Sequence, residues 1–150
     1  MANEYYEDEI EYFKHIGHEL GHLWWRNGIH DSWEDWLNES FAEYSALLAI
    51  RVVYGEDKFN EFIDMYKKET KDFAPIKNID RSASNAHALL YKKGPVIVSE
   101  LEKQVGMEAF QKLLGEVYSR KVDHTELLYE VISEAINDKA KEMLDKFLNT

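Results

Sequence analysis

The sequence contains no cysteine, and this absence excludes two kinds of structure at once. Without thiols the chain can form neither disulfide bonds nor thiolate metal sites, so any metal ion must be held by histidine and carboxylate side chains. Proline and glycine are also scarce, with two and seven residues respectively. Because these residue types most often interrupt regular structure, their scarcity favours long helices.

A basic surface and a long apolar run are also lacking. The formal net charge is −11, and the acidic residues are spread along the chain. A nucleic-acid partner is therefore not expected, because phosphate binding needs positive charge. No segment reaches the roughly 20 apolar residues of a membrane span, and the acidic N-terminus does not resemble a signal peptide. These features favour a cytoplasmic location.

Hydrophobic residues make up 45% of the chain, which is enough for one compact domain over residues 1–150. The apolar periodicity predicts an all-α fold. We expect helices over about residues 4–26, 35–54, 56–70, 86–105, 107–118, 124–136 and 138–148, with a loop over 71–85. Gly94-Pro95 should break the fourth of these helices, and Asp123 and Asn137 are candidate N-caps.

The segment HELGH (residues 18–22) places two histidines four residues apart on the first expected helix. Side chains at this spacing project from one helix face, so the imidazoles of His18 and His22 can reach one zinc ion. Glu19 lies beside them, where its carboxylate can contact a water on the metal. The pattern alone is weak, and its alternative is a pair of polar residues on a solvated face.

Two glycines flank this motif inside the expected helix. Gly17 and Gly21 each cost about 1 kcal/mol relative to alanine, which is easier to explain if another segment packs close to the backbone. The apolar neighbours Ile16, Leu20 and Leu23 likewise predict a well-covered helix. Both features favour a metal-binding helix over a solvated one.

A catalytic zinc site needs a third protein ligand and an open position. Glu39 and Glu43 lie four residues apart on the second expected helix, which is otherwise mostly apolar. From composition alone, a solvated acidic stripe is the simpler interpretation of this pair. Glu39 is nevertheless the best candidate for the third ligand.

Three blocks of the sequence resemble the zinc aminopeptidases of peptidase family M1, the gluzincins typified by aminopeptidase N and leukotriene hydrolase. HELGHLWWRN (18–27) is similar to H-E-x-x-H-x-W-x-G-N, WLNESFA (36–42) to W-L-N-E-G-F-A, and YKKG (91–94) to Y-x-K-G. The resemblance extends over essentially the whole chain. It implies the multi-helix C-terminal lobe of a thermolysin-like catalytic domain.

The resemblance also implies a role for each matching residue. His18, His22 and Glu39 would bind one zinc ion. Glu19 would be the general base and later the proton donor to the leaving amine, and Tyr91 would donate a hydrogen bond to the oxyanion. The implied activity is aminopeptidase-like hydrolysis of a peptide substrate. Without the Y-x-K-G context, Tyr91 would be an ordinary partly buried tyrosine.

Asn38 and Glu43 are expected to contact the metal ligands and hold them in place without binding the metal themselves. A carboxylate at position 43 departs from the family pattern, where a small residue is common. It could accept a hydrogen bond from the free imidazole N–H of His18 or His22 and so fix the tautomer. The alternative is that Glu43 is a surface carboxylate.

The remaining histidines and the tryptophans carry weaker signals. His87 precedes Tyr91 by one helical turn and could face the same cleft. We assign no role to His15, His30 and His124. We expect the four tryptophans to lie in the core, namely Trp24, Trp25, Trp33 and Trp36.

Two departures from the family pattern bear on the substrate. Sixteen residues separate His22 from Glu39, whereas the family usually has eighteen, which puts the substrate contacts of that loop in doubt. The family's G-x-M-E-N segment, whose glutamate holds the substrate's α-amine, is absent, as is its N-terminal β domain. We therefore expect either an excised part of a longer catalytic domain, with the N-terminal portion as its missing partner, or a minimal stand-alone peptidase.

Three functions remain open. The leading one is a zinc peptidase. The second is a helical domain that binds zinc or a partner without cleaving, which the missing β domain favours and the intact set of catalytic residues opposes. The third is a purely structural helical module whose matches are accidental.

Overall fold

A computed structural model describes residues 2–150, with side-chain environments from residue 7 onward. As predicted, the described residues form an all-α structure and contain no strand. The helices are α1 (Ala2–Gly21), α2 (Trp36–Tyr54), α3 (Glu56–Thr70), α4 (Ala86–Ala88), α5 (Gly94–Val105), α6 (Met107–Ser119), α7 (Thr125–Ala135) and α8 (Asp138–Leu148). A 3-10 turn, η1 (Trp33–Asp35), precedes α2, and a π-helical turn, η2 (Leu89–Lys93), joins α4 to α5. Residues 71–85 form the expected loop.

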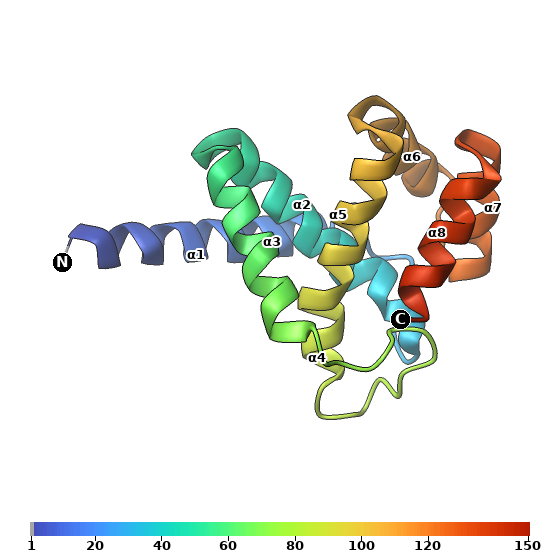
Figure 1. Cartoon of the computed structure of the whole chain (residues 1–150), viewed down its shortest axis with the longest axis horizontal. Coiled ribbons are helices and arrows are strands. Elements are labelled where there is room, and N and C mark those ends of the chain that lie inside the picture. Colours follow the sequence, from blue (N-terminus) through green and yellow to red (C-terminus); the bar gives the residue numbers. More distant parts are fainter. Residues whose placement is uncertain (1) are drawn as a thin grey trace.

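The central element is α2, which contacts α1, α3 and α5 (Figure 1). The later helices α6, α7 and α8 pack in series beside α5. Because α2 is covered on several sides, its buried residues surround the helix instead of forming a single stripe. The rings of Trp36 and Tyr44 are among the largest buried side chains of the core, together with Phe41.

Glycine on α1 allows that helix to approach α2 closely. A Cβ added at Gly17 would lie 3.2 Å from the Cβ of Ala46, and one added at Gly21 would lie 3.0 Å from the Cα of Ala42. These contacts confirm the prediction that a segment packs close to the backbone at both glycines. They bring the H-E-x-x-H segment against the helix that carries Glu39.

The end of α1 lies at Gly21, so the predicted end at residues 27–28 is wrong. After this residue the chain turns, and the backbone N–H groups of Trp24 and Trp25 both donate to the carbonyl of Gly21 at 3.0 Å. The turn carries Trp25 to α2, where its indole N–H donates to Ser45 at 2.8 Å. Burial of this indole against α2 overrides the helical periodicity of the sequence.

The outer face of α1 is exposed, contrary to the prediction that the helix is well covered. The exposed fractions are 51% for Ile16, 54% for Leu20 and 58% for Leu23. Trp24 is also half-exposed, whereas the other three tryptophans lie in the core or pack against it. Even so, none of the helices in residues 2–150 has the length and apolar character needed to cross a membrane.

The predicted break at Gly94-Pro95 is absent, because the chain stays helical through α4, η2 and α5. In the π-helical turn the N–H of Gly94 donates to the carbonyl of Leu89. The corresponding partner of the Leu90 carbonyl would be Pro95, which has no N–H. Ser40 of α2 supplies the missing bond by donating its hydroxyl to that carbonyl at 2.7 Å.

The last two helices begin with different kinds of cap. Asn137 caps α8 as predicted, since its Oδ1 accepts from a backbone N–H of the first turn at 2.8 Å. The predicted cap at Asp123 is wrong, because the N-cap of α7 is His124 and its side chain makes no capping bond. The first N–H of α7, at Thr125, instead donates to Glu34 of η1 at 2.7 Å. This carboxylate is 91 residues away along the chain, so local sequence could not reveal it.

Candidate metal centre

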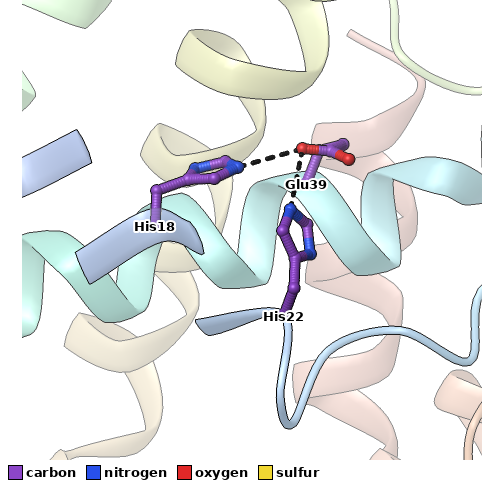
Figure 2. A group of neighbouring side chains, drawn as sticks. All are labelled: His18, His22 and Glu39. Atoms are coloured by element: carbon purple, nitrogen blue, oxygen red, sulfur yellow. Dashed lines mark hydrogen bonds and ion pairs between the residues drawn. The ribbon is translucent and has the colours of Figure 1, made fainter. Parts of the chain in front are cut away.

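His18 and His22 on α1 and Glu39 on α2 converge on one point (Figure 2). The Oε2 atom of Glu39 lies 3.1 Å from Nε2 of His18 and 3.4 Å from Nε2 of His22. The two imidazoles are nearly perpendicular, at 80°, with 4.9 Å between ring centroids. The fold thus brings together the three residues that the sequence suggested as ligands.

The chemistry and spacing of these donors fit a zinc ion. One nitrogen from each imidazole and one carboxylate oxygen all lie within 4.8 Å of one another. Ligands about 2.0–2.2 Å from a tetrahedral zinc ion are about 3.3–3.6 Å apart, close to the two distances given above. Two histidines and one glutamate form a known catalytic zinc set, with a fourth position left for water. Within the described part of the chain, no other group of His, Asp and Glu donors meets the same test.

Both imidazoles are anchored through Nδ1, which leaves Nε2 directed toward Glu39. The Nδ1–H of His18 donates to Oε2 of Glu43 at 2.7 Å. The Nδ1–H of His22 donates to the backbone carbonyl of Trp25 at 3.0 Å. Such bonds fix the tautomer and orientation of a ligand and raise its basicity. Because α1 ends at Gly21, the chain turns and brings the Trp25 carbonyl within hydrogen-bond distance of His22. The early end of the helix therefore orients a proposed ligand as well as burying Trp25.

Glu43 is buried and is itself held by two further groups. Its Oε1 accepts from Nζ of Lys14 at 3.2 Å and from the hydroxyl of Tyr66 at 2.9 Å. Burial alone would raise the pKa of Glu43, but the hydrogen bond to His18 and the charge of Lys14 outweigh it and lower the pKa. The group behind His18 is therefore a carboxylate that can only accept. No sequence pattern pointed to Lys14 and Tyr66, which lie on different helices.

The site combines a strongly basic imidazole with a strongly acidic carboxyl. Burial opposes the charged form of His18, yet hydrogen bonds to Glu39 and Glu43 raise its pKa from 6.5 to about 9. Burial likewise opposes ionisation of Glu39, yet hydrogen bonds from His18 and Tyr91 lower its pKa to about 2. At neutral pH a carboxylate is thus available for a cation, and metal binding has to displace the proton of His18.

Asn38 was expected behind the ligands, but it lies in the first turn of α2 and its side chain reaches back to the connection before that helix. Its Oδ1 accepts from the N–H of Gly28 at 2.8 Å, and its Nδ2 donates to the Gly28 carbonyl at 3.0 Å and to Asp35 at 2.8 Å. Asp35 is buried and also accepts from Nε of Arg81 at 2.8 Å. The ion pair of Asp35 and Arg81, which the sequence did not predict, links the shortened connection before α2 to the loop over residues 71–85.

The two residues expected to act on substrate, Glu19 and Tyr91, line one cavity of about 360 Å³ beside the ligands. His87 lines the same cavity. Burial and a hydrogen bond to Glu39 raise the pKa of Tyr91, so its hydroxyl keeps its proton at neutral pH. The structure therefore gathers a carboxylate and a phenol donor at the edge of the candidate metal site.

Comparison with known proteins identifies the family. The family model described as "Peptidase family M1 domain" matches residues 2–150. The chain belongs to peptidase family M1. Among its M1 relatives, endoplasmic reticulum aminopeptidase 2 of Bos taurus is 31% identical over 117 residues, which is 70% of this chain and 12% of the relative. Aminopeptidase M1-B of Oryza sativa subsp. japonica is 28% identical over 144 residues, 86% of this chain and 16% of that protein.

Solved M1 structures share the fold. A variant of the M1 zinc metallopeptidase from Deinococcus radiodurans, bound to a Tyr-Ser-Ala substrate, matches with a TM-score of 0.77 at 23% identity, over 91% of this chain and 33% of that one. A two-domain M1 zinc metallopeptidase bound to L-tryptophan matches with a TM-score of 0.78 at 19% identity, over the same shares. The chain thus has the all-α fold of an M1 C-terminal lobe and spans about a third of the length of these proteins.

Proposed function

We propose that the chain is a zinc-dependent peptidase whose metal ligands are His18, His22 and Glu39. The observation that carries the proposal is the convergence of two imidazole nitrogens and one carboxylate oxygen within 4.8 Å. Membership of a family of aminopeptidases and zinc metallopeptidases supports it. Zinc bound there would lower the pKa of a water to about 7 and polarise the substrate carbonyl.

The side chains around the ligands supply the proton transfers. Glu19 faces the cavity next to His18, so its carboxylate can take the proton of the attacking water and pass it to the leaving amine. Tyr91 keeps its proton and can donate it in a hydrogen bond to the developing oxyanion, a contribution of about 3 kcal/mol by analogy with other oxyanion donors. Glu43 holds the His18 ring in the tautomer that presents Nε2.

The decisive experiment is cleavage of a fluorogenic peptide by the 150-residue chain. We expect activity with zinc, loss on addition of a chelator, and recovery when zinc is returned. Glu19→Gln should lower turnover by about 100- to 10,000-fold, because it removes the proton-transfer group. Its zinc content should stay stoichiometric, since Glu19 is not a ligand. Turnover at the wild-type rate in this variant would refute the role of Glu19.

As the substrate class we propose peptides with a free N-terminus. The support is that relatives bear the name aminopeptidase and that one solved neighbour holds Tyr-Ser-Ala. The comparison to make is between a peptide and its N-acetylated form. Faster cleavage of the free peptide is expected, whereas equal rates would indicate endopeptidase action.

A non-catalytic domain that binds zinc or a partner is the second candidate. The exposed apolar side chains of Ile16, Leu20 and Leu23, beside the metal-binding segment, favour it because such a surface is suited to a protein contact. Stoichiometric zinc without chelator-sensitive cleavage would support this candidate over the first. A chain that binds no zinc would instead be a structural module.

A further inference from the structure

The ring of Tyr91 lies between two imidazoles. It stacks on His18, with 4.7 Å between ring centroids and 11° between the planes. It also stacks on His87, with 3.9 Å between centroids and 20° between the planes. Two rings stacked at these distances occupy opposite faces of the phenol, so the three rings form one column.

The two ends of this column are held in different ways. His18 is buried and fixed by its bond to Glu43, so it forms the rigid end. His87 is exposed and lies one helical turn before Tyr91, at the junction where α4 passes into the π-helical turn. Residues four apart share one side of a helix, which lets the His87 ring cover the outer face of the phenol. Both rings border the cavity beside the ligands.

If the Tyr91 hydroxyl assists catalysis, the ring must stay in place while the hydroxyl changes its hydrogen-bond partner. Burial and the interaction with Glu39 raise the pKa of the Tyr91 hydroxyl, so Glu39 is its polar neighbour in this structure. That interaction has to give way when the hydroxyl turns to a substrate oxyanion, and Glu39 then no longer restrains the ring. The stack persists, because it uses the ring faces and not the hydroxyl. Catalytic groups must be placed to within about 0.5 Å, so a ring free on its outer side would be poorly positioned.

We infer that His87 is a positioning residue, which holds the Tyr91 ring against His18 from the cavity side. The inference rests on the proposed function, because that function gives the Tyr91 hydroxyl its partner in the reaction. His87 acts through its ring face and contributes no proton. Any flat ring at position 87 should therefore serve, whereas a small side chain should not.

Kinetics of the zinc-loaded 150-residue chain test this inference. His87→Ala should lower kcat by roughly tenfold to 100-fold, since the phenol loses its outer support. KM should change by less than about twofold, because ground-state binding is not affected. His87→Phe restores a ring and should recover most of kcat. Full kcat in His87→Ala, or a loss that His87→Phe does not repair, would overturn the inference.

A matched control separates this effect from the general loss of a surface histidine. His124 is exposed and bonds to its neighbour Asp123 at 2.6 Å. It lies at the start of α7 and is not among the residues that line the cavity. His124→Ala should leave kcat unchanged, and a comparable drop in this variant would argue against a specific role for His87.

NMR spectroscopy can test the stack of His87 on Tyr91 without any measurement of peptide cleavage. In NMR spectra of the same chain, the ring current of Tyr91 should move the Cε1–H resonance of His87 upfield. Tyr91→Leu should abolish that shift and Tyr91→Phe should retain it. An unshifted resonance would overturn the inference even in an active chain. A shifted resonance in a chain that cleaves no peptide would refute the proposed function, and with it the catalytic purpose of the stack.

Discussion

The hydroxyl of Ser40 donates to the carbonyl of Leu90 at 2.7 Å, and this bond joins the two segments that carry Glu39 and Tyr91. The contact is tight, because a Cβ added at Gly94 would overlap the Ser40 hydroxyl and lie 2.5 Å from the Ser40 Cβ. Glu39, the proposed ligand, directly precedes Ser40 in the sequence. Tyr91, the proposed oxyanion donor, directly follows Leu90. Both are therefore adjacent to this buried hydrogen bond. The bond therefore helps to fix the position of Tyr91 relative to Glu39.

The contact predicts a specific coupling between positions 40 and 94. Gly94→Ala should destabilise the fold by about 1–3 kcal/mol, because the new methyl meets Ser40. Ser40→Gly removes the obstacle, so the double variant should be destabilised by less than the sum of the two single changes. Urea unfolding of the four proteins measures the coupling. Strict additivity would show that the two residues do not touch.

The carboxylate behind His18 should control metal affinity. Glu43→Gln replaces an ionised acceptor by a neutral amide, and we expect zinc affinity to fall by about 10- to 100-fold. Competition against a chelator of known affinity measures the change. Glu142→Gln, an exposed carboxylate on α8, is the matched control and should bind zinc like the wild type. Unchanged affinity in Glu43→Gln would discard the role of this residue.

The pair formed by Asp35 and Arg81 should hold the loop over residues 71–85. Arg81→Gln weakens the support of a buried carboxylate, which should cost about 1–3 kcal/mol in the free energy of unfolding. Amide hydrogen exchange should become faster in this loop and in the connection before α2. Lys71→Gln, an exposed change in the same loop, should do neither. Equal exchange in the two variants would mean that the ion pair does not restrain the loop.

Asp145 should make part of the stability dependent on pH. It accepts from Nζ of Lys77 at 2.9 Å and from the hydroxyl of Tyr129 at 2.8 Å, and these bonds, that of Lys77 first, lower its pKa below the usual 3.8. The folded state therefore binds this proton less readily than the unfolded chain. The resulting stabilisation is complete above the unfolded pKa and disappears as the pH falls through the folded pKa.

The measurement for Asp145 is the thermal midpoint of the wild type and of Asp145→Asn at two pH values. Near neutral pH the variant should be less stable, because it lacks the charge. The difference should shrink near pH 3, where the carboxyl begins to bind its proton. Because the site is largely solvated, the effect should be small. A difference of equal size at both pH values would mean that the charge contributes nothing.

Local signals predicted much of the helical framework. The bounds of α3 and α8 agree with the expected ranges, and a single residue marks the start of each helix, Gly55 for α3 and Asn137 for α8. Gly55 and Gly106 adopt φ values of 99° and 87°, a conformation that other residues rarely take, and each ends one helix before the next begins. Asn137 provides a side-chain cap in the same local manner. Prediction failed at the end of α1, where the Trp25 indole bonds to Ser45 of α2, and at Gly94-Pro95, where Ser40 of α2 donates to the Leu90 carbonyl.

The amino-acid sequence by itself determined the all-α class, the helix ends at glycine and asparagine, and the one-turn spacing of His18 and His22, because each depends on residues within a few positions. Only the tertiary structure decided that Glu39 reaches those imidazoles, that Lys14 and Tyr66 hold the carboxylate behind one of them, and that a π-helical turn presents Tyr91. These contacts join segments roughly 20 to 70 residues apart. They exist because glycine on α1 and on α5 lets both helices approach α2 closely, which is a property of packing and not of any single segment.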